Sequence, residues 1–63
     1  MKNNIKEYRE KLNMTQIELA KKSEISRYLI SQLENGEDVN ITKKTMVQIA
    51  TALNANVLEI FLL

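Results

Sequence analysis

Apolar residues recur every three or four positions along most of the chain, which is the spacing that places side chains on one face of an α-helix. The pattern predicts five short helices, over residues 4–12, 16–23, 27–35, 43–53 and 57–61. Their inward positions are Ile5, Tyr8 and Leu12, then Leu19 and Ala20, then Ile30 and Leu33, and then Met46, Val47, Ile49, Ala50 and Leu53. We therefore expect an all-α fold, arranged as a compact five-helix bundle.

Residues suited to helix ends bracket these segments. The predicted N-terminal caps are the pairs Asn4 with Glu7, Thr15 with Glu18 and Asn56 with Glu59, together with the single caps Ser26 and Thr42. Such pairs satisfy backbone N–H groups that have no partner within the helix. Gly36 and Asn54 are predicted to end the third and fourth helices, because both residue types tolerate a left-handed backbone.

The composition narrows the possible chemistry. The chain has 63 residues, with one Gly and no Pro, Cys or His, so we expect one small domain over residues 1–63. The lack of Cys and His excludes nucleophilic triads, histidine acid–base catalysis and soft-metal sites such as zinc. We expect no cofactor, no metal and no small-molecule ligand. The formal net charge of +1 favours no particular partner.

No targeting or membrane segment is evident from the sequence. The first four residues lead into a charged stretch, unlike the apolar stretch of a signal peptide. The longest apolar run, residues 60–63, is far shorter than the roughly 20 residues that a membrane-spanning helix needs. We expect a cytoplasmic protein that has no membrane contact and no separate sensing domain.

The second and third predicted helices carry the most specific motif. They are joined by a turn of about three residues, which is the spacing of a helix-turn-helix. Residues 15–36 run TQIELAKKSEISRYLISQLENG, and residues 49–61 run IATALNANVLEIF. The first segment resembles the motif of the phage-repressor (Cro-like) helix-turn-helix family, in which a Thr-Gln pair, a Leu-Ala pair and a final Leu-Glu-x-Gly recur. The second resembles the fourth and fifth helices of that family.

The resemblance covers nearly the whole chain and implies both a fold and a function. It implies a lambda-repressor-like DNA-binding domain and a transcriptional regulator that binds double-stranded DNA sequence-specifically. We expect a repressor that binds a pseudo-palindromic operator as a homodimer and, by covering it, blocks or recruits polymerase.

The third helix supplies the candidate DNA-reading residues. Because Ile30 and Leu33 occupy its inward side, the side chains left for the major groove are Arg27, Tyr28, Ser31 and Gln32. Arg can donate two hydrogen bonds to guanine, and Gln can pair with adenine. Tyr28 could contact a thymine methyl group, bond a phosphate or pack against a protein partner.

Other positions are candidates for contacts with the DNA backbone. By resemblance, Gln16 contacts phosphate and braces the third helix, and Asn35 bonds a phosphate. Lys43 and Lys44 fall in the first turn of the fourth helix, where cations oppose the helix dipole unless an anion binds there. They suit either a phosphate contact or a solvated surface.

Four features depart from the family pattern. Glu24 holds a turn position that is usually Gly, so either the turn bends differently or the backbone is strained. The acids Glu37 and Asp38 follow Gly36, where they would repel phosphate unless they point away. Leu29 and Ile17 are apolar at positions expected to face outward.

The last seven residues contain six apolar side chains, more than one short helix can bury. Val57, Ile60 and Phe61 are expected to seal the core, and Leu58, Leu62 and Leu63 to stay partly exposed. Exposed apolar patches usually mark an interface. We expect a dimer interface formed by Leu58, Phe61, Leu62 and Leu63, unless these residues pack on the first helix.

Two other classes of function compete with a DNA-binding regulator. A protein-interaction module on the same fold, of antitoxin or anti-repressor kind, would use Tyr28, Leu29 and the Glu37-Asp38 pair. An enzyme is disfavoured, because the acids of the first 36 residues are expected on separate helices or exposed faces, without a second catalytic group; they are Glu7, Glu10, Glu18, Glu24 and Glu34.

Overall fold

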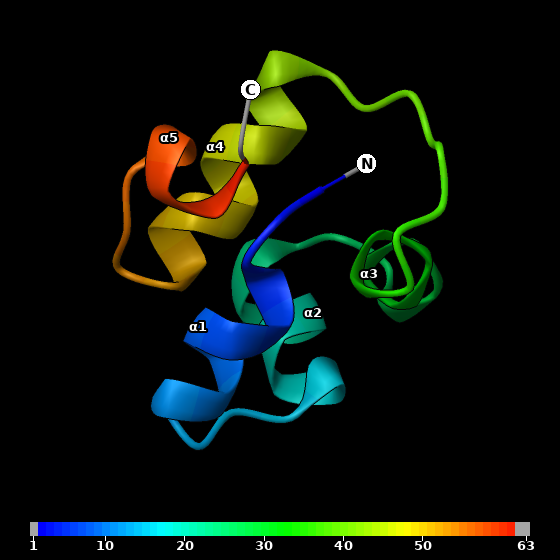
Figure 1. The fold of residues 1–63 in the computed structure, drawn as a ribbon. Helices are drawn as coiled ribbons and strands as arrows, with labels where there is room; N and C mark the ends of the chain where they lie inside the picture. The colour runs from blue at the N-terminus through cyan, green and yellow to red at the C-terminus, as the bar shows by residue number, and fades with distance from the viewer. Residues whose placement is uncertain (1, 62–63) are drawn as a thin grey trace.

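Five helices form the framework of the computed structural model, which describes residues 2–61 (Figure 1). They are α1 (Ile5–Lys11), α2 (Gln16–Ser23), α3 (Arg27–Glu34), α4 (Lys43–Ala52) and α5 (Val57–Ile60). The predicted all-α fold is confirmed; α2 has the predicted bounds, and the other observed helices are shorter than predicted by no more than one residue at either end. Within residues 2–61, no helix is both long enough and apolar enough to cross a bilayer.

The core draws on every helix. The largest fully buried side chains are Ile5, Leu19, Ile30, Leu33, Ile49, Ile60 and Phe61. Two predicted inward residues, Leu12 and Val47, are instead 44% exposed. Leu12 is the residue that ends α1, so its side chain lies beyond the last helical turn. The helical periodicity thus identified the core-facing side of each helix but assigned two exposed residues to it.

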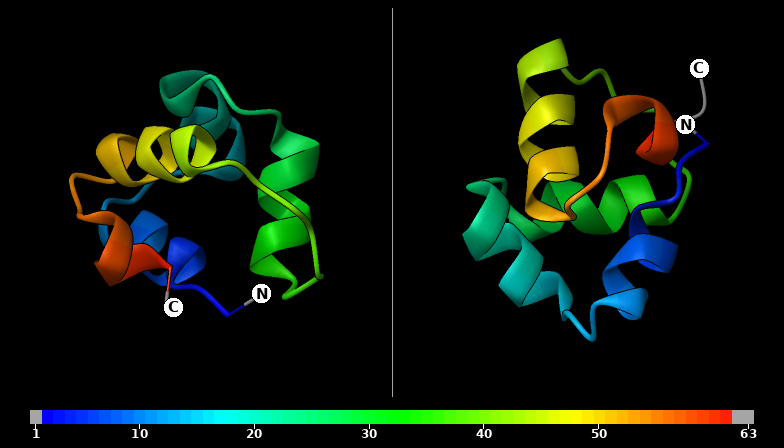
Figure 2. Two further views of the ribbon diagram at one scale, coloured as in Figure 1. Left: turned by 90° about the horizontal axis from the view of Figure 1, so that it is seen from above. Right: turned by 90° about the vertical axis from the view of Figure 1, so that its left-hand side faces the viewer.

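The two ends of the described chain are tied together. The amide of Asn4 donates to the carbonyl of Ile60 at 2.7 Å, and Asn3 forms an isolated antiparallel bridge with Phe61. Figure 2 shows the first residues running beside the end of α5. The predicted Asn4–Glu7 capping pair is wrong for this reason. The Asn4 side chain donates to the carbonyl of Glu59, and the Asn3 side chain accepts from the amide of Ile5.

The other predicted caps are present. The Thr15 hydroxyl accepts from the Glu18 amide at 3.0 Å, while the Glu18 carboxylate accepts from the Thr15 amide at 2.9 Å. The remaining caps follow the same logic: Ser26 accepts from the Leu29 amide, Thr42 from the Thr45 amide, and the Glu59 carboxylate from the Asn56 amide. Short polar side chains therefore fix where the helices begin.

Left-handed residues end the helices. Gly36 has φ 76° and Asn54 has φ 54°, as predicted. Glu24, which follows α2, has φ 60° and ψ 30°. The turn therefore keeps the geometry that suits Gly and places a residue with a Cβ in it, at a cost of about 1–2 kcal/mol. The strained alternative is the correct one.

Replacing Glu24 with Gly should raise the unfolding free energy by about 1 kcal/mol, because relief of the left-handed strain exceeds the entropy that Gly adds to the unfolded chain. Urea denaturation measures the change. Glu24→Ala is the matched control, since it removes the carboxylate and retains the Cβ. If Glu24→Gly were no more stable than Glu24→Ala, backbone strain at this residue would be disproved.

The capping box of α2 should make the stability of the protein depend on pH. Hydrogen bonds from the Thr15 backbone and side chain lower the pKa of Glu18 below its ordinary value of 4.5. A lowered pKa contributes stability above the ordinary value, and that contribution is lost as the pH falls through the lowered pKa. Glu18→Gln should therefore melt below the wild type at neutral pH, and the two melting temperatures should converge in acid. Thr15→Ala is the comparison: it removes the bond from the Glu18 amide to the Thr15 hydroxyl, which does not itself titrate, so part of its deficit should persist in acid.

Candidate nucleic-acid interface

A tight turn, residues 24–26, joins α2 to α3. The Ile25 amide donates to the carbonyl of Ala20 at 3.2 Å, which closes α2. The Ser26 hydroxyl then starts α3 by accepting from the Leu29 amide at 3.1 Å. The turn sends α3 across the molecule to one edge, where it is seen end-on in Figure 1. Only one side of α3 can therefore pack against the rest of the protein.

A cluster of three side chains, Arg9, Glu34 and Gln16, fixes the position of α3. The Nε of Arg9 donates to Glu34 Oε2 at 2.8 Å, and its Nη2 donates to Glu34 Oε1 at 3.0 Å. Gln16 Nε2 donates to the same Oε1 at 3.1 Å. The side chains of Arg9 and Glu34 are 11% and 5% exposed. We call this cluster the Glu34 clamp, because it joins α1, the start of α2 and the end of α3.

The clamp also orders the loop between α1 and α2. Arg9 Nη1 donates to the carbonyl of Met14 at 2.7 Å, so one guanidinium group contacts both the loop and α3. Hydrogen bonding to Glu34 raises the pKa of Arg9 above its already high ordinary value. Paired, nearly buried Arg and carboxylate groups are costly to separate.

The outer side of α3 carries most of the candidate DNA-reading residues. Ile30 and Leu33 are fully buried, whereas Arg27 and Tyr28 are exposed and Ser31 is half-buried. Arg27, Tyr28 and Ser31 line one shallow hollow together with Gln16 from the first turn of α2. The structure therefore brings together four residues that the sequence placed on two helices.

The remaining candidates on α3 lie outside that hollow. Gln32 is half-buried, and its carbonyl accepts from the amide of Glu37 at 3.1 Å. Asn35 is exposed and ends α3, where its amide donates to the carbonyl of Ser31. Gln32 and Asn35 therefore lie further along the chain than the residues that line the hollow, and α3 ends at Asn35.

The departures from the family pattern divide into two groups. Leu29 does not face outward as expected; it is half-buried and packs against the core, because it lies beside the inward positions of α3. Ile17 is half-exposed, as expected. Glu37 and Asp38 are both exposed just after Gly36. Leu29 therefore belongs to the protein interior, and the acidic pair stays at the surface.

Two helix N-termini flank α3. Lys43 and Lys44 are exposed in the first turn of α4, which has no acidic residue and is capped by Thr42. In Figure 1, the first turn of α4 lies above α3 and the first turn of α2 lies below it, and the right-hand view of Figure 2 keeps the same vertical order. Helix N-termini attract anions. The first turn of α4 has no acidic residue and presents a positive pole, whereas at the start of α2 the Glu18 carboxylate, which accepts from the Thr15 amide, offsets the pole.

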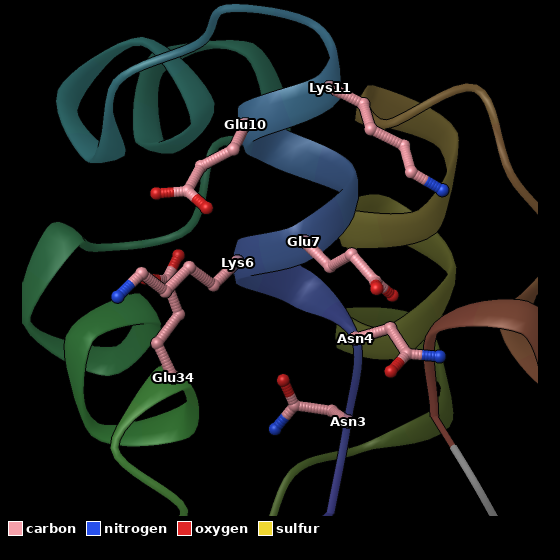
Figure 3. Close-up of a pocket in the computed structure, with 7 residues that line it drawn as sticks. All are labelled: Asn3, Asn4, Lys6, Glu7, Glu10, Lys11 and Glu34. Atoms are coloured by element: carbon pink, nitrogen blue, oxygen red, sulfur yellow. The ribbon is translucent and has the colours of Figure 1, made fainter.

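A second surface hollow lies against α1 and includes Glu34 in its lining (Figure 3). Its lining is charged and of both signs: Asn3, Asn4, Lys6, Glu7, Glu10, Lys11 and Glu34. Figure 3 shows Lys6, Glu10 and Glu34 on one side of α1, and Glu7 and Lys11 on the other. Because cations and carboxylates alternate here, this hollow favours no anionic ligand.

Comparison with known proteins agrees with this geometry. A protein-family model described as helix-turn-helix matches residues 5–60, from the first residue of α1 to the last of α5. The chain belongs to the helix-turn-helix family of DNA-binding transcriptional regulators. It is also similar to an uncharacterized HTH-type transcriptional regulator of Archaeoglobus fulgidus. The two are 44% identical over 62 residues, which cover 98% of this chain and 86% of the relative.

In this helix-turn-helix protein, α2 and α3 are the two helices of the motif, with residues 24–26 as the turn. The resemblance argued from residues 15–36 is thereby confirmed at the level of the family. Gln16 contacts Glu34 directly, which agrees with its expected role as a brace for α3.

Sequence reasoning missed the clamp itself. Glu34 was expected on a separate helix or an exposed face, whereas it is nearly buried and paired with Arg9. One signal was available: Glu34 directly follows the inward Leu33, which places its carboxylate at the margin of the buried side. Its partner is 25 residues away in the chain, and helical periodicity contains no information on that pairing.

Breaking the clamp from one side should destabilise the protein strongly. Arg9→Met or Glu34→Leu alone should each lower the unfolding free energy by about 3 kcal/mol, because each leaves a nearly buried charge unpaired. The double variant leaves no charge unpaired, so it should lose about 3–5 kcal/mol rather than the roughly 6 kcal/mol of two independent losses, which gives a coupling energy of about 1–3 kcal/mol in denaturant titrations.

The matched control is Lys6→Met with Glu10→Leu, an exposed pair one turn apart on α1. Exposed pairs contribute little, so these two changes should add within about 0.5 kcal/mol. Equal coupling in both pairs would show that burial of the clamp has no energetic consequence.

Proposed function

We propose that this protein is a sequence-specific repressor that binds a pseudo-palindromic DNA operator as a homodimer, with residues 1–63 acting as one DNA-binding domain in the cytoplasm. The observation that supports this most is the grouping of Gln16, Arg27, Tyr28 and Ser31 around one hollow on the exposed side of α3. An α-helix fits the major groove, which is about 12 Å wide. Polar side chains on its outer side can then reach base edges.

Arg27 and Gln32 are the proposed base-reading residues of α3. Arg27 is exposed in the first turn of the helix, the part that enters the groove in this motif. Its guanidinium group can donate two hydrogen bonds to guanine O6 and N7, and the Gln32 amide can pair with adenine. Ser31 can bond to either type of base.

Contacts with phosphate would come from the flanks of α3. Gln16 lies at the N-terminus of α2, while Lys43 and Lys44 lie at the N-terminus of α4, so each side offers a helix pole with polar or basic side chains. Asn35 would contact phosphate at the far end of α3. Glu37 and Asp38 oppose these contacts electrostatically, which favours modest affinity for non-specific DNA.

Leu58 supports the proposed dimer. It is 71% exposed on α5, an unusual position for a large apolar side chain. Phe61 serves the core of its own protomer, since it is fully buried, so its expected place in the interface is not retained. Leu62 and Leu63 lie outside the described residues. A two-fold dimer would place two α3 helices about 34 Å apart, one turn of DNA.

Selection of bound duplexes from a random pool tests the proposed function. We expect enrichment of two inverted half-sites whose centres are about 10–10.5 base pairs apart. Enrichment of no sequence, with no gel retardation at low salt, would contradict DNA binding. It would favour a protein-interaction module instead, for which the exposed Tyr28 and Ile17 offer apolar surface.

Two substitutions should separate base reading from phosphate contact. Arg27→Ala should weaken operator binding by about 1–3 kcal/mol and relax the preference at one base pair. Lys44→Ala should weaken all sequences about equally and lower the log–log salt slope by about one. Affinities measured on the operator and a scrambled duplex over a salt series provide both readouts. If Arg27→Ala behaved like Lys44→Ala, the base-reading role of Arg27 would be wrong.

A single substitution should separate the protomers. Leu58→Lys should shift the sedimentation mass from dimer to monomer without unfolding the protein, because the side chain is mostly exposed. Circular dichroism checks the fold of the variant. A wild-type protein that sedimented as a monomer at every concentration would remove the dimer from the proposal.

A further inference from the structure

Tyr28 has an unusual position for an aromatic residue. Its side chain is 74% exposed, more than that of any other large apolar residue among residues 2–61. It lies in the first turn of α3 and borders the hollow shared with Gln16, Arg27 and Ser31. No hydrogen bond joins its side chain to another residue of the described part of the chain. Neither packing nor hydrogen bonding within the protomer therefore explains the aromatic ring.

The direction of Tyr28 on α3 indicates what it would meet. At about 100° per residue, Tyr28 lies roughly 160° around the helix from Ile30 and roughly 140° from Leu33. Because those two side chains are fully buried, Tyr28 points almost directly away from the core. A side chain in this direction faces the floor of a groove that α3 enters. The phosphates line the groove walls, which the flanking N-termini of α2 and α4 face.

The chemistry of the groove floor selects one contact. Base pairs present hydrogen-bond donors and acceptors in the major groove, and the one apolar group among them is the C5-methyl of thymine. We propose that Tyr28 determines specificity by packing its ring against the C5-methyl group of a thymine in each half-site. This inference rests on the proposed function. It assigns the role to the ring of Tyr28 and excludes a bond from its hydroxyl to phosphate.

Deoxyuridine offers a direct probe, because it differs from thymidine only by the missing methyl group. Each thymine of one selected half-site is replaced in turn by deoxyuridine, and the affinity is measured for the wild type, Tyr28→Phe and Tyr28→Ala. Loss of one methyl contact should weaken wild-type binding about fourfold at one thymine. Tyr28→Phe should retain both the affinity and this fourfold loss. Tyr28→Ala should bind more weakly and be insensitive to the replacement.

Three results would overturn the inference and leave the proposed function intact. In the first, the wild type binds every deoxyuridine duplex as tightly as the unmodified one. In the second, Tyr28→Ala is still weakened by the deoxyuridine that weakens the wild type. In the third, Tyr28→Phe binds more weakly than the wild type, although deoxyuridine does not weaken its binding further. The last result would assign the contact to the hydroxyl. A protein that selects no duplex at all would instead refute the proposed function itself. Since Tyr28 is exposed, neither variant should perturb the fold, and circular dichroism checks this.

Discussion

The arrangement of α3 depends on one carboxylate. Glu34 accepts two hydrogen bonds from Arg9 on α1 and one from Gln16 at the start of α2, and it is itself the last residue of α3. Helices α1, α2 and α3 are therefore held at a common point beside the hollow that contains Gln16 and Arg27. The same interaction that stabilises the fold also fixes the orientation of the Gln16 side chain.

An interaction that joins three helices at one point matters in a chain of 63 residues. A domain of this size buries a smaller fraction of its surface than a larger one, and this one has no disulfide to compensate. It relies on side-chain caps at the helix starts, on the bridge between Asn3 and Phe61, and on the Glu34 clamp. The strained Glu24 shows that stability was not maximised at every position.

The sequence predicted what is local and missed what is distant. Periodicity located all five helices, and capping residues such as Thr15 and Ser26 located their starts, because both signals lie within four residues of the feature they determine. Two other interactions depend on how distant segments of the chain meet in the fold. They are the Arg9–Glu34 pair and the hydrogen bond from the Asn4 side chain to the carbonyl of Glu59. The candidate reading residues followed from the motif, whereas their grouping around one hollow required the fold.

The outer side of α3, held by the Glu34 clamp, is the surface that we propose meets DNA. The most direct measurement is nitrogen–proton correlation NMR during titration with a duplex at low salt. We expect backbone amide signals to shift in the first turn of α2, along α3 and in the first turn of α4, while those of α5 and α1 stay in place. Shifts confined to α5 or α1, with α3 unchanged, would contradict it.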